Sequence, residues 1–189
     1  MKKLLMVAAV LALPMTATAQ SVQKENAGDL SYNFAEIRFV DVDESDGDGL
    51  RFAGSFEIND EWILVGGLTL LDFDFDIDST TLEIGGGYVW NYSDDFDLVS
   101  TLRYVRVDFD TPLGDFDDSG FALSSGIRGF IAPQFEIRGS ANYINVDDSD
   151  TFIELAGDYY FTDQISAGIS LQLAGDADVF SIGARWYFR

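Results

Sequence analysis

The stretch Leu50-Arg-Phe-Ala-Gly-Ser-Phe-Glu-Ile58 alternates between two kinds of residue, with apolar side chains or glycine at every second position. Successive side chains of a β-strand point to opposite faces, so this run predicts a strand with one oily face and one polar face. The stretch Phe180-Ser-Ile-Gly-Ala-Arg-Trp-Tyr-Phe188 repeats the alternation near the C-terminus. Between the two stretches the pattern continues, interrupted by residues that are typical of turns.

Ten segments with this alternation are predicted to be strands. They cover residues 30–41, 50–58, 62–72, 80–90, 96–108, 119–131, 135–146, 151–161, 165–174 and 178–188. Behind a secretory signal, such a series predicts an all-β protein, a transmembrane antiparallel up-and-down β-barrel with lipid outside and a polar lumen inside. About ten strands are expected, with eight as the alternative. An even number brings both chain ends to the periplasmic side.

The N-terminus has the features of a secretory signal peptide. Lys2 and Lys3 supply a positive start, residues 4–13 an apolar core, and Ala17-Thr-Ala19 a cleavage site of small residues. The predicted organisation is a cleaved signal peptide at residues 1–19, a periplasmic N-terminal segment at residues 20–29 and the outer-membrane barrel at residues 30–189.

Composition argues against several classes of function. The chain contains no cysteine, so it forms no disulfide and offers no thiol chemistry. Its net charge of −22 would repel phosphate, so nucleic acid is not an expected partner. The chain also contains no histidine, the side chain that serves most often as a general base near neutral pH. We therefore expect no enzyme activity and no catalytic residues.

Aromatic residues gather at one end of the predicted strands. Trp62 opens a strand after a short turn, Trp90 closes one before a short turn, and Trp186 lies near the end of the last strand. Amphipathic rings favour the boundary between lipid and water. The predicted periplasmic aromatic girdle consists of Trp62, Tyr88, Trp90, Phe135, Tyr159, Phe161, Trp186 and Phe188.

The predicted inner face of the barrel carries charges of both signs in equal number. This lumen charge network consists of Glu36, Arg38, Arg51, Glu57, Glu83, Arg103, Arg128, Glu136, Arg138, Glu154, Asp158 and Arg185. It holds six of the eight arginines in the chain. Arginine suits buried pairing because its planar guanidinium group binds a carboxylate at two points.

Two interpretations of the lumen remain open. In the first, a salt-bridged plug fills the periplasmic half, because burying an unpaired charge is costly; it would be formed by Glu57, Arg128, Glu136, Arg138, Asp158 and Arg185. In the second, the many small inward residues leave a narrow passage lined with charges that selects small polar solutes. A barrel of eight strands is just filled by its own side chains, and ten strands give only modestly more room.

The predicted outer connections are acidic. They lie at residues 42–49, 73–79, 109–118, 147–150 and 175–177, and they contain no lysine or arginine. The simplest interpretation is a solvated rim that repels neighbouring molecules. Carboxylate oxygens at this density also suit Ca²⁺ or Mg²⁺, so a weak metal site at Asp43, Asp46 and Asp48 is the alternative. The spacing lacks the glutamate of an EF-hand loop. No other cofactor is expected.

With its signal peptide, ten amphipathic strands and closing Ala184-Arg-Trp-Tyr-Phe188, the chain resembles the small outer-membrane β-barrel families of the opacity and porin-like type. The resemblance implies a Gram-negative outer-membrane protein that contacts outer-membrane lipid and lipopolysaccharide and is inserted by the barrel assembly machinery through its C-terminal strand. Two functions remain open, a narrow diffusion channel for small polar solutes and a non-conducting structural or surface-interaction barrel. The outward face shows no polar stripe for a partner to cover, so a monomer is expected.

Overall fold

The computed structural model describes residues 30–43, 47–74, 77–112, 114–175 and 178–188. The predicted signal peptide and N-terminal segment lie outside these ranges. The strands are β1 (Phe34–Val42), β2 (Gly47–Glu57), β3 (Trp62–Phe73), β4 (Ile77–Asn91), β5 (Phe96–Thr111), β6 (Gly114–Ala132), β7 (Phe135–Asn145), β8 (Ser149–Thr162), β9 (Ile165–Leu173) and β10 (Val179–Tyr187). Within the described ranges, no helix is long and apolar enough to cross a membrane.

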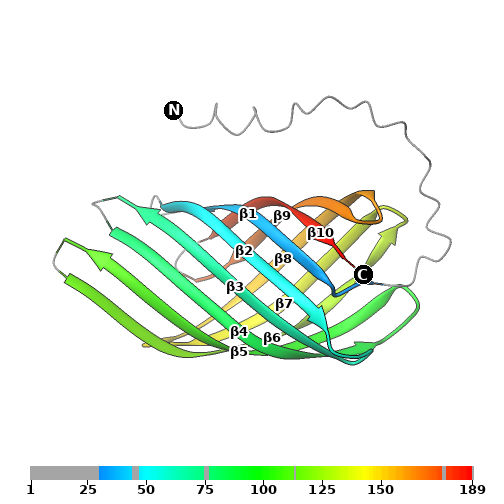
Figure 1. Ribbon diagram of the computed structural model, residues 1–189, viewed down its shortest axis with the longest axis horizontal. Coiled ribbons are helices and arrows are strands. Elements are labelled where there is room, and N and C mark those ends of the chain that lie inside the picture. Colours follow the sequence, from blue (N-terminus) through cyan, green and yellow to red (C-terminus); the bar gives the residue numbers. More distant parts are fainter. Residues whose placement is uncertain (1–29, 44–46, 75–76, 113, 176–177, 189) are drawn as a thin grey trace.

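The strands form one closed antiparallel barrel, as predicted. Each strand pairs with its neighbours in the sequence, and β1 closes the sheet by pairing with β10 (Figure 1). The first and last strands are in register from Phe34 opposite Tyr187 to Val42 opposite Val179. The prediction of ten strands is confirmed, and the alternative of eight is wrong.

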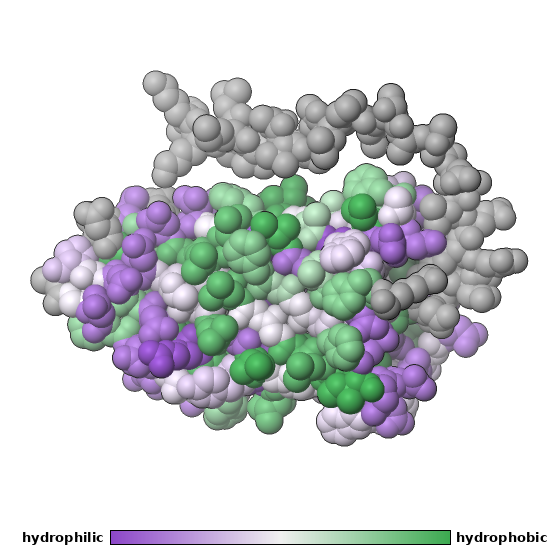
Figure 2. Space-filling view, viewed as in Figure 1, coloured by the Kyte–Doolittle hydropathy of each residue, from purple (hydrophilic) through white to green (hydrophobic). Residues whose placement is uncertain are grey.

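The barrel wall separates the two faces that the alternation predicts. On β2, Leu50, Phe52 and Phe56 point outward and are exposed, whereas Arg51 and Ser55 between them line the interior. Large exposed aliphatic side chains recur on the outer face of the other strands, which would be unfavourable in water and suits lipid. Figure 2 shows apolar side chains over the middle of the wall and hydrophilic ones gathered towards its ends.

The two ends of the barrel differ in their connections. We call one the turn end, because short turns join its strands at residues 58–61, 92–95, 133–134 and 163–164. The start of β1 and the end of β10 also lie there, at the right in Figure 1. The other end, which we call the loop end, carries the acidic connections. The start of the first strand and the end of the last strand therefore lie at the same end of the barrel, as expected for an even number of strands.

At the loop end, one predicted connection is wrong. Residues 109–118 do not form a loop, because β5 runs to Thr111 and β6 starts at Gly114, with these two residues paired. An ion pair of 2.9 Å joins Arg106 to Asp108 on the outside of this hairpin. Alternation in the sequence ends where the lipid-facing apolar side chains end, but backbone pairing continues beyond that point because polar side chains also fit a solvated ladder.

Candidate functional site

Near the turn end, buried charged side chains in the lumen form ion pairs. Arg128 of β6 donates two hydrogen bonds to Glu136 of β7, from Nε to Oε1 over 2.8 Å and from Nη2 to Oε2 over 2.9 Å. The two side chains are 6% and 0% exposed. The hydroxyl of Tyr160 also donates to Glu136, and Arg128 Nη2 donates to the hydroxyl of Tyr187 over 3.1 Å. This carboxylate is therefore held from several directions at once.

A second group of charges lies beside this pair. Arg185 donates to Glu36 from Nε over 3.0 Å and from Nη2 over 2.6 Å. Glu36 also pairs with Arg38 on its own strand, over 2.9 Å. Asp158 bridges two arginines, with 3.4 Å to Arg38 and 2.9 Å to Arg138. Residues far apart in the sequence, such as Glu36 and Arg185, thus form ion pairs because β1 pairs with β10 where the barrel closes.

The two groups are continuous with each other. Arg185 Nη1 lies 3.5 Å and Arg138 Nε 3.6 Å from Glu136 Oε1. We call the whole set the floor network; it consists of Glu36, Arg38, Arg128, Glu136, Arg138, Asp158 and Arg185. Buried ions are tolerated only when paired, and this network pairs every one of its members.

Glycines on neighbouring strands make room for the inward arginines. Arg38 lies opposite Gly183, where an added Cβ would stand 2.6 Å from Arg38 Cγ. Arg103 lies opposite Gly85, where an added Cβ would stand 2.9 Å from Arg103 Cγ. Real Cβ atoms do not approach other atoms this closely. The added Cβ would stand closer still to a backbone oxygen of the facing strand, Ile37 O at Gly183 and Leu102 O at Gly85, so neither position has room for a side chain beside the arginine.

The residues just before β1 lie in the lumen and contact the floor network. The Tyr32 hydroxyl donates to Asp97 over 2.8 Å, and Arg128 lies over the Tyr32 ring at 4.6 Å. Arg128 Nη1 donates to the carbonyl oxygen of Ser31 over 2.9 Å. Burial raises the pKa of Tyr32 above its ordinary value, so the phenol keeps the proton that it donates. The chain thus enters the lumen before it joins the wall.

Glu57 anchors this entering segment instead of pairing with an arginine. Its carboxylate accepts hydrogen bonds from Tyr32 N and from Asn33 Nδ2, the latter over 3.0 Å, and its own backbone N donates to Asn33 Oδ1 over 2.8 Å. Within the part of the chain that the structure describes, Glu57 therefore contacts the entering segment and not the arginines of the predicted plug. Asp97 is a lumen carboxylate that the predicted charge network lacks. Asp97 could have been found, because it shares the inward face of β5 with Arg103.

A buried apolar cluster also lies at this end of the barrel. Tyr32, Ile63 and Val89 form a buried cluster at the turn end, with Leu30, Val65 and Val99 packed against it. The turn half of the lumen therefore has hydrocarbon on one side and the floor network on the other.

Farther from the turn end, the lumen is lined with charge but is less tightly filled. Glu83 accepts hydrogen bonds from Arg51 over 3.0 Å and from Arg103 over 3.1 Å. Arg51 keeps 29% of its side chain exposed to the lumen. Glu154 lies on β8, across the lumen from these strands, and is partly exposed. Among the described residues, no hydrogen bond or ion pair shorter than 4 Å reaches Glu154.

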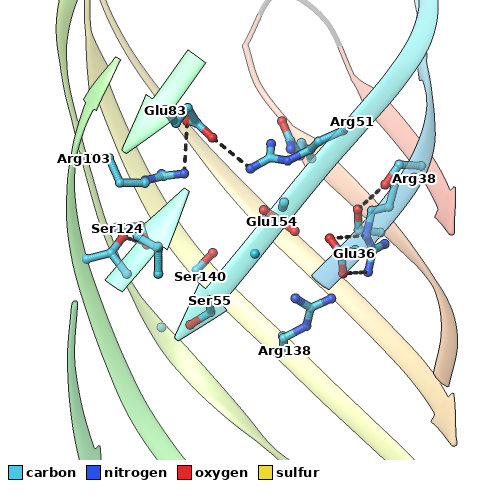
Figure 3. Close-up of a pocket in the computed structure, with 18 of the residues that line it drawn as sticks. Glu36, Arg38, Arg51, Ser55, Glu83, Arg103, Ser124, Arg138, Ser140 and Glu154 are labelled. Carbon is cyan, nitrogen blue, oxygen red and sulfur yellow. Dashed lines mark hydrogen bonds and ion pairs between the residues drawn. The ribbon is translucent and has the colours of Figure 1, made fainter. Parts of the chain in front are cut away.

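Two cavities occupy this part of the lumen. The larger has a volume of about 350 Å³ and extends from Tyr32 and Arg128 at the floor to Val42 and Val179 near the loop end. The smaller has a volume of about 220 Å³. Six residues line both cavities, and we call them the shared ring: Arg51, Thr69, Glu83, Arg103, Glu154 and Gln172. Figure 3 shows that Arg51, Glu83, Arg103 and Glu154 point into the same space.

The residues of the predicted aromatic girdle all lie at the turn end. Trp62 and Tyr88 contact each other across β3 and β4, with ring centroids 5.2 Å apart, and Phe135 and Tyr159 do so across β7 and β8 at 6.3 Å. The three tryptophans are more than half exposed. Phe188 lies directly after β10 and contacts Trp186 at 5.8 Å. The outward rings form a band around one end of the wall.

The residues of the predicted metal site are only partly described. Asp43 and Asp48 flank the connection between β1 and β2, and Asp46 lies outside the described residues. Across the described part of the chain, no three Asp, Glu, His or Cys side chains are grouped closely enough to hold a metal ion. Weak binding of Ca²⁺ or Mg²⁺ at the loop end stays a prediction.

Comparison with known families agrees with this architecture. The family model described as the outer membrane protein beta-barrel domain matches residues 5–188. The chain belongs to this family. It is accordingly a bacterial outer-membrane protein with a porin-like barrel, in contact with membrane lipid. A search of curated proteins finds no significant match in sequence.

Two solved porins are similar to this family member in structure. The NanC porin has a TM-score of 0.54 and 11% identity, over 82% of this chain and 100% of that chain. The KdgM porin, solved in complex with disordered oligogalacturonate, has a TM-score of 0.51 and 14% identity, over 82% of this chain and 99% of that chain. At such low identity, the similarity shows the fold alone.

Proposed function

We propose that the protein is a closed porin-like barrel that does not conduct in this conformation and acts through its outer surface and the part of its lumen that opens towards the loop end. The observation that carries the proposal is the position of Arg128. It binds Glu136 on one side and the Ser31 carbonyl on the other, and it covers the Tyr32 ring. These contacts span the turn half of the lumen.

The free energy needed to separate the buried ion pairs supports closure. Opening a passage through the floor would separate Arg128 from Glu136, and each group would need water in place of its partner. Breaking a buried pair by removing one partner costs about 3–5 kcal/mol. The seal around Tyr32 would have to move as well, which would expose Ile63 and Val89. Closed barrels with the floor network intact should therefore dominate.

A second candidate is a narrow diffusion channel for small polar solutes. The cavity of about 350 Å³ favours it, because its lining is charged and includes the small residues Ala53, Ser55 and Ser140. In this alternative the residues before β1 would leave the lumen and the floor network would rearrange.

The remaining partners follow from the site of action. We infer that the turn end faces the periplasm and the acidic loop end faces the exterior, where divalent ions would bridge its carboxylates to lipopolysaccharide phosphates. The C-terminal strand β10 would be the segment that the barrel assembly machinery receives. A monomer agrees with the apolar outer wall, whose exposed side chains suit lipid on every strand.

Solute flux into liposomes tests the proposal. Liposomes that contain the refolded protein are placed in solutions of arabinose or serine, and swelling is followed by light scattering. Closure predicts swelling no faster than in empty liposomes. Rapid swelling with the wild-type protein would support the diffusion channel instead. Heat-modifiable migration in gels verifies that the barrel is folded in each sample.

A further inference from the structure

We infer that the shared ring is a binding site for a small zwitterionic solute, one that carries both an ammonium group and a carboxylate. Such binding goes beyond closure of the barrel, because a solute can occupy the ring without passing the floor. The ring residues line both cavities, so they can be reached by a molecule in either one.

The arrangement of charge in the ring determines the class of solute. Arg51 and Arg103 share the single carboxylate of Glu83, which leaves an excess of positive charge on that wall. Glu154 on β8 has no ion pair among the described residues. A carboxylate would be attracted to Arg51, whose side chain remains 29% exposed. An ammonium group would be attracted to Glu154.

Solutes with a single sign of charge are less well matched. A simple anion near Arg51 meets the repulsion of Glu154, and a simple cation near Glu154 meets that of Arg51 and Arg103. These groups all line both cavities, so neither kind of ion avoids the opposing charge. A solute with both charges satisfies both walls, and the low dielectric of the wall strengthens each attraction.

Two buried polar residues that line the larger cavity have an atom that a bound solute could pair with. Arg38 Nη1 and Ser55 Oγ are buried and have no hydrogen-bond partner within the described ranges. Both residues line the larger cavity, and each is at least nine-tenths buried. Buried polar groups in proteins nearly always have a partner, either protein or water. A polar solute or an ordered water in the cavity would supply one.

The size of the cavity also fits. Small-molecule sites in proteins usually have volumes of about 300–1,000 Å³. The larger cavity, at about 350 Å³, lies at the lower limit of that range and so suits a solute of the size of an amino acid.

Isothermal titration calorimetry of the refolded barrel in detergent tests the proposal with three related probes: alanine, propionate, which lacks the ammonium group of alanine, and ethylamine, which lacks its carboxylate. Alanine carries both charges, and the other two carry one each. We expect saturable binding of alanine and binding at least tenfold weaker for either single-charge probe, since a charge-assisted hydrogen bond contributes about 1.5–3 kcal/mol.

Two substitutions in the ring distinguish this site from others. Glu154→Gln keeps the shape of the side chain and Arg51→Gln shortens it, and both remove its charge, so each should weaken alanine binding by roughly tenfold. Glu61→Gln is the matched control, because Glu61 is exposed in the turn between β2 and β3 and should leave binding unchanged. Heat-modifiable migration establishes that each variant is folded.

Three results would overturn the inference. The first is equal binding of alanine and propionate, which would identify a plain anion site. The second is a Glu154→Gln variant that binds alanine as tightly as Glu61→Gln does. The third is an absence of saturable heat across the millimolar range in the folded wild-type protein. None of these results depends on whether the barrel conducts, so they are distinct from failure of the proposed closure.

Discussion

Arg128 and Glu136 lie on the two strands that flank the turn at residues 133–134, and their side chains meet through two parallel hydrogen bonds of 2.8 and 2.9 Å. The guanidinium and the carboxylate are thus joined in a fork, the strongest geometry for such a pair. Because Arg128 also holds Ser31 and lies over Tyr32, the pair links the barrel wall to the segment that closes it.

Removal of Arg128 should strongly destabilise the barrel. In Arg128→Ala, Glu136 keeps the hydrogen bond from the Tyr160 hydroxyl, but its remaining contacts to arginine are the longer ones to Arg185 and Arg138, at 3.5 and 3.6 Å. Removing one partner of a buried pair costs about 3–5 kcal/mol. Urea unfolding of the protein refolded in lipid vesicles measures the change in the free energy of unfolding.

The matched control is Arg106→Ala. Arg106 lies on the outside of the barrel, and its side chain is 48% exposed. Exposed ion pairs contribute about 0–1 kcal/mol, so this loss of an arginine should change the free energy of unfolding little. Equal losses in Arg106→Ala and Arg128→Ala would contradict the importance assigned to the floor network.

Substitution of Gly183 tests the space that the floor network needs. In Gly183→Ala, the new Cβ would stand 2.6 Å from Arg38 Cγ and closer still to the backbone oxygen of Ile37, so β1 must shift together with its arginine. Overpacking of this kind typically costs about 1–3 kcal/mol. In Gly157→Ala the nearest atom is Phe135 Cε1 at 3.8 Å, so that control should unfold at nearly the wild-type urea concentration. The reverse order would contradict the account.

The Tyr32 hydroxyl should contribute measurably to the seal. In Tyr32→Phe the ring remains beneath Arg128, but buried Asp97 loses its donor at 2.8 Å. An unsatisfied buried acceptor costs about 1–3 kcal/mol. We expect a loss of this size in urea unfolding, whereas Tyr92→Phe, at an exposed position of a turn, should be neutral. A neutral Tyr32→Phe would mean that residues 30–33 are not held in the lumen.

The tryptophans should all lie at one depth in the bilayer. Trp62, Trp90 and Trp186 are outward and at the turn end, where rings favour the boundary of the lipid. Fluorescence of variants with a single tryptophan, in vesicles with lipids brominated at different depths, should be quenched most by bromine close to the headgroups. Strongest quenching of any of the three by bromine at the bilayer centre would contradict the placement.

Much of this architecture could be predicted because the alternation of inward and outward side chains depends only on residues that are neighbours in the sequence. Alternation assigns each residue to a face, so the inward position of Arg128, Glu136 and Arg185 followed from neighbouring residues alone. The pairs themselves could not be predicted. Glu36 meets Arg185 at a sequence separation of 149, and this contact depends on how β1 closes onto β10.

The seal was missed for a different reason. Tyr32 and Asn33 precede β1, and their place is fixed by Glu57 and Asp97 on other strands, not by any pattern of their own. Likewise, the length of the hairpin formed by β5 and β6 depends on backbone pairing. Acidic side chains permit this pairing, but they give no sequence pattern that predicts it. Sequence patterns therefore defined the wall better than what lies inside it or beyond the lipid.

Single-channel recording in planar bilayers tests closure by the floor network most directly. We expect no steady openings from the wild-type protein or from Arg106→Ala, and openings from Arg128→Ala and from Tyr32→Ala, in which the contacts between Tyr32 and Arg128 are lost. Tyr32→Ala keeps every ion pair of the floor network, so it gives a result even if Arg128→Ala fails to fold. Steady conductance from the folded wild-type protein, unchanged by either substitution, would contradict the account.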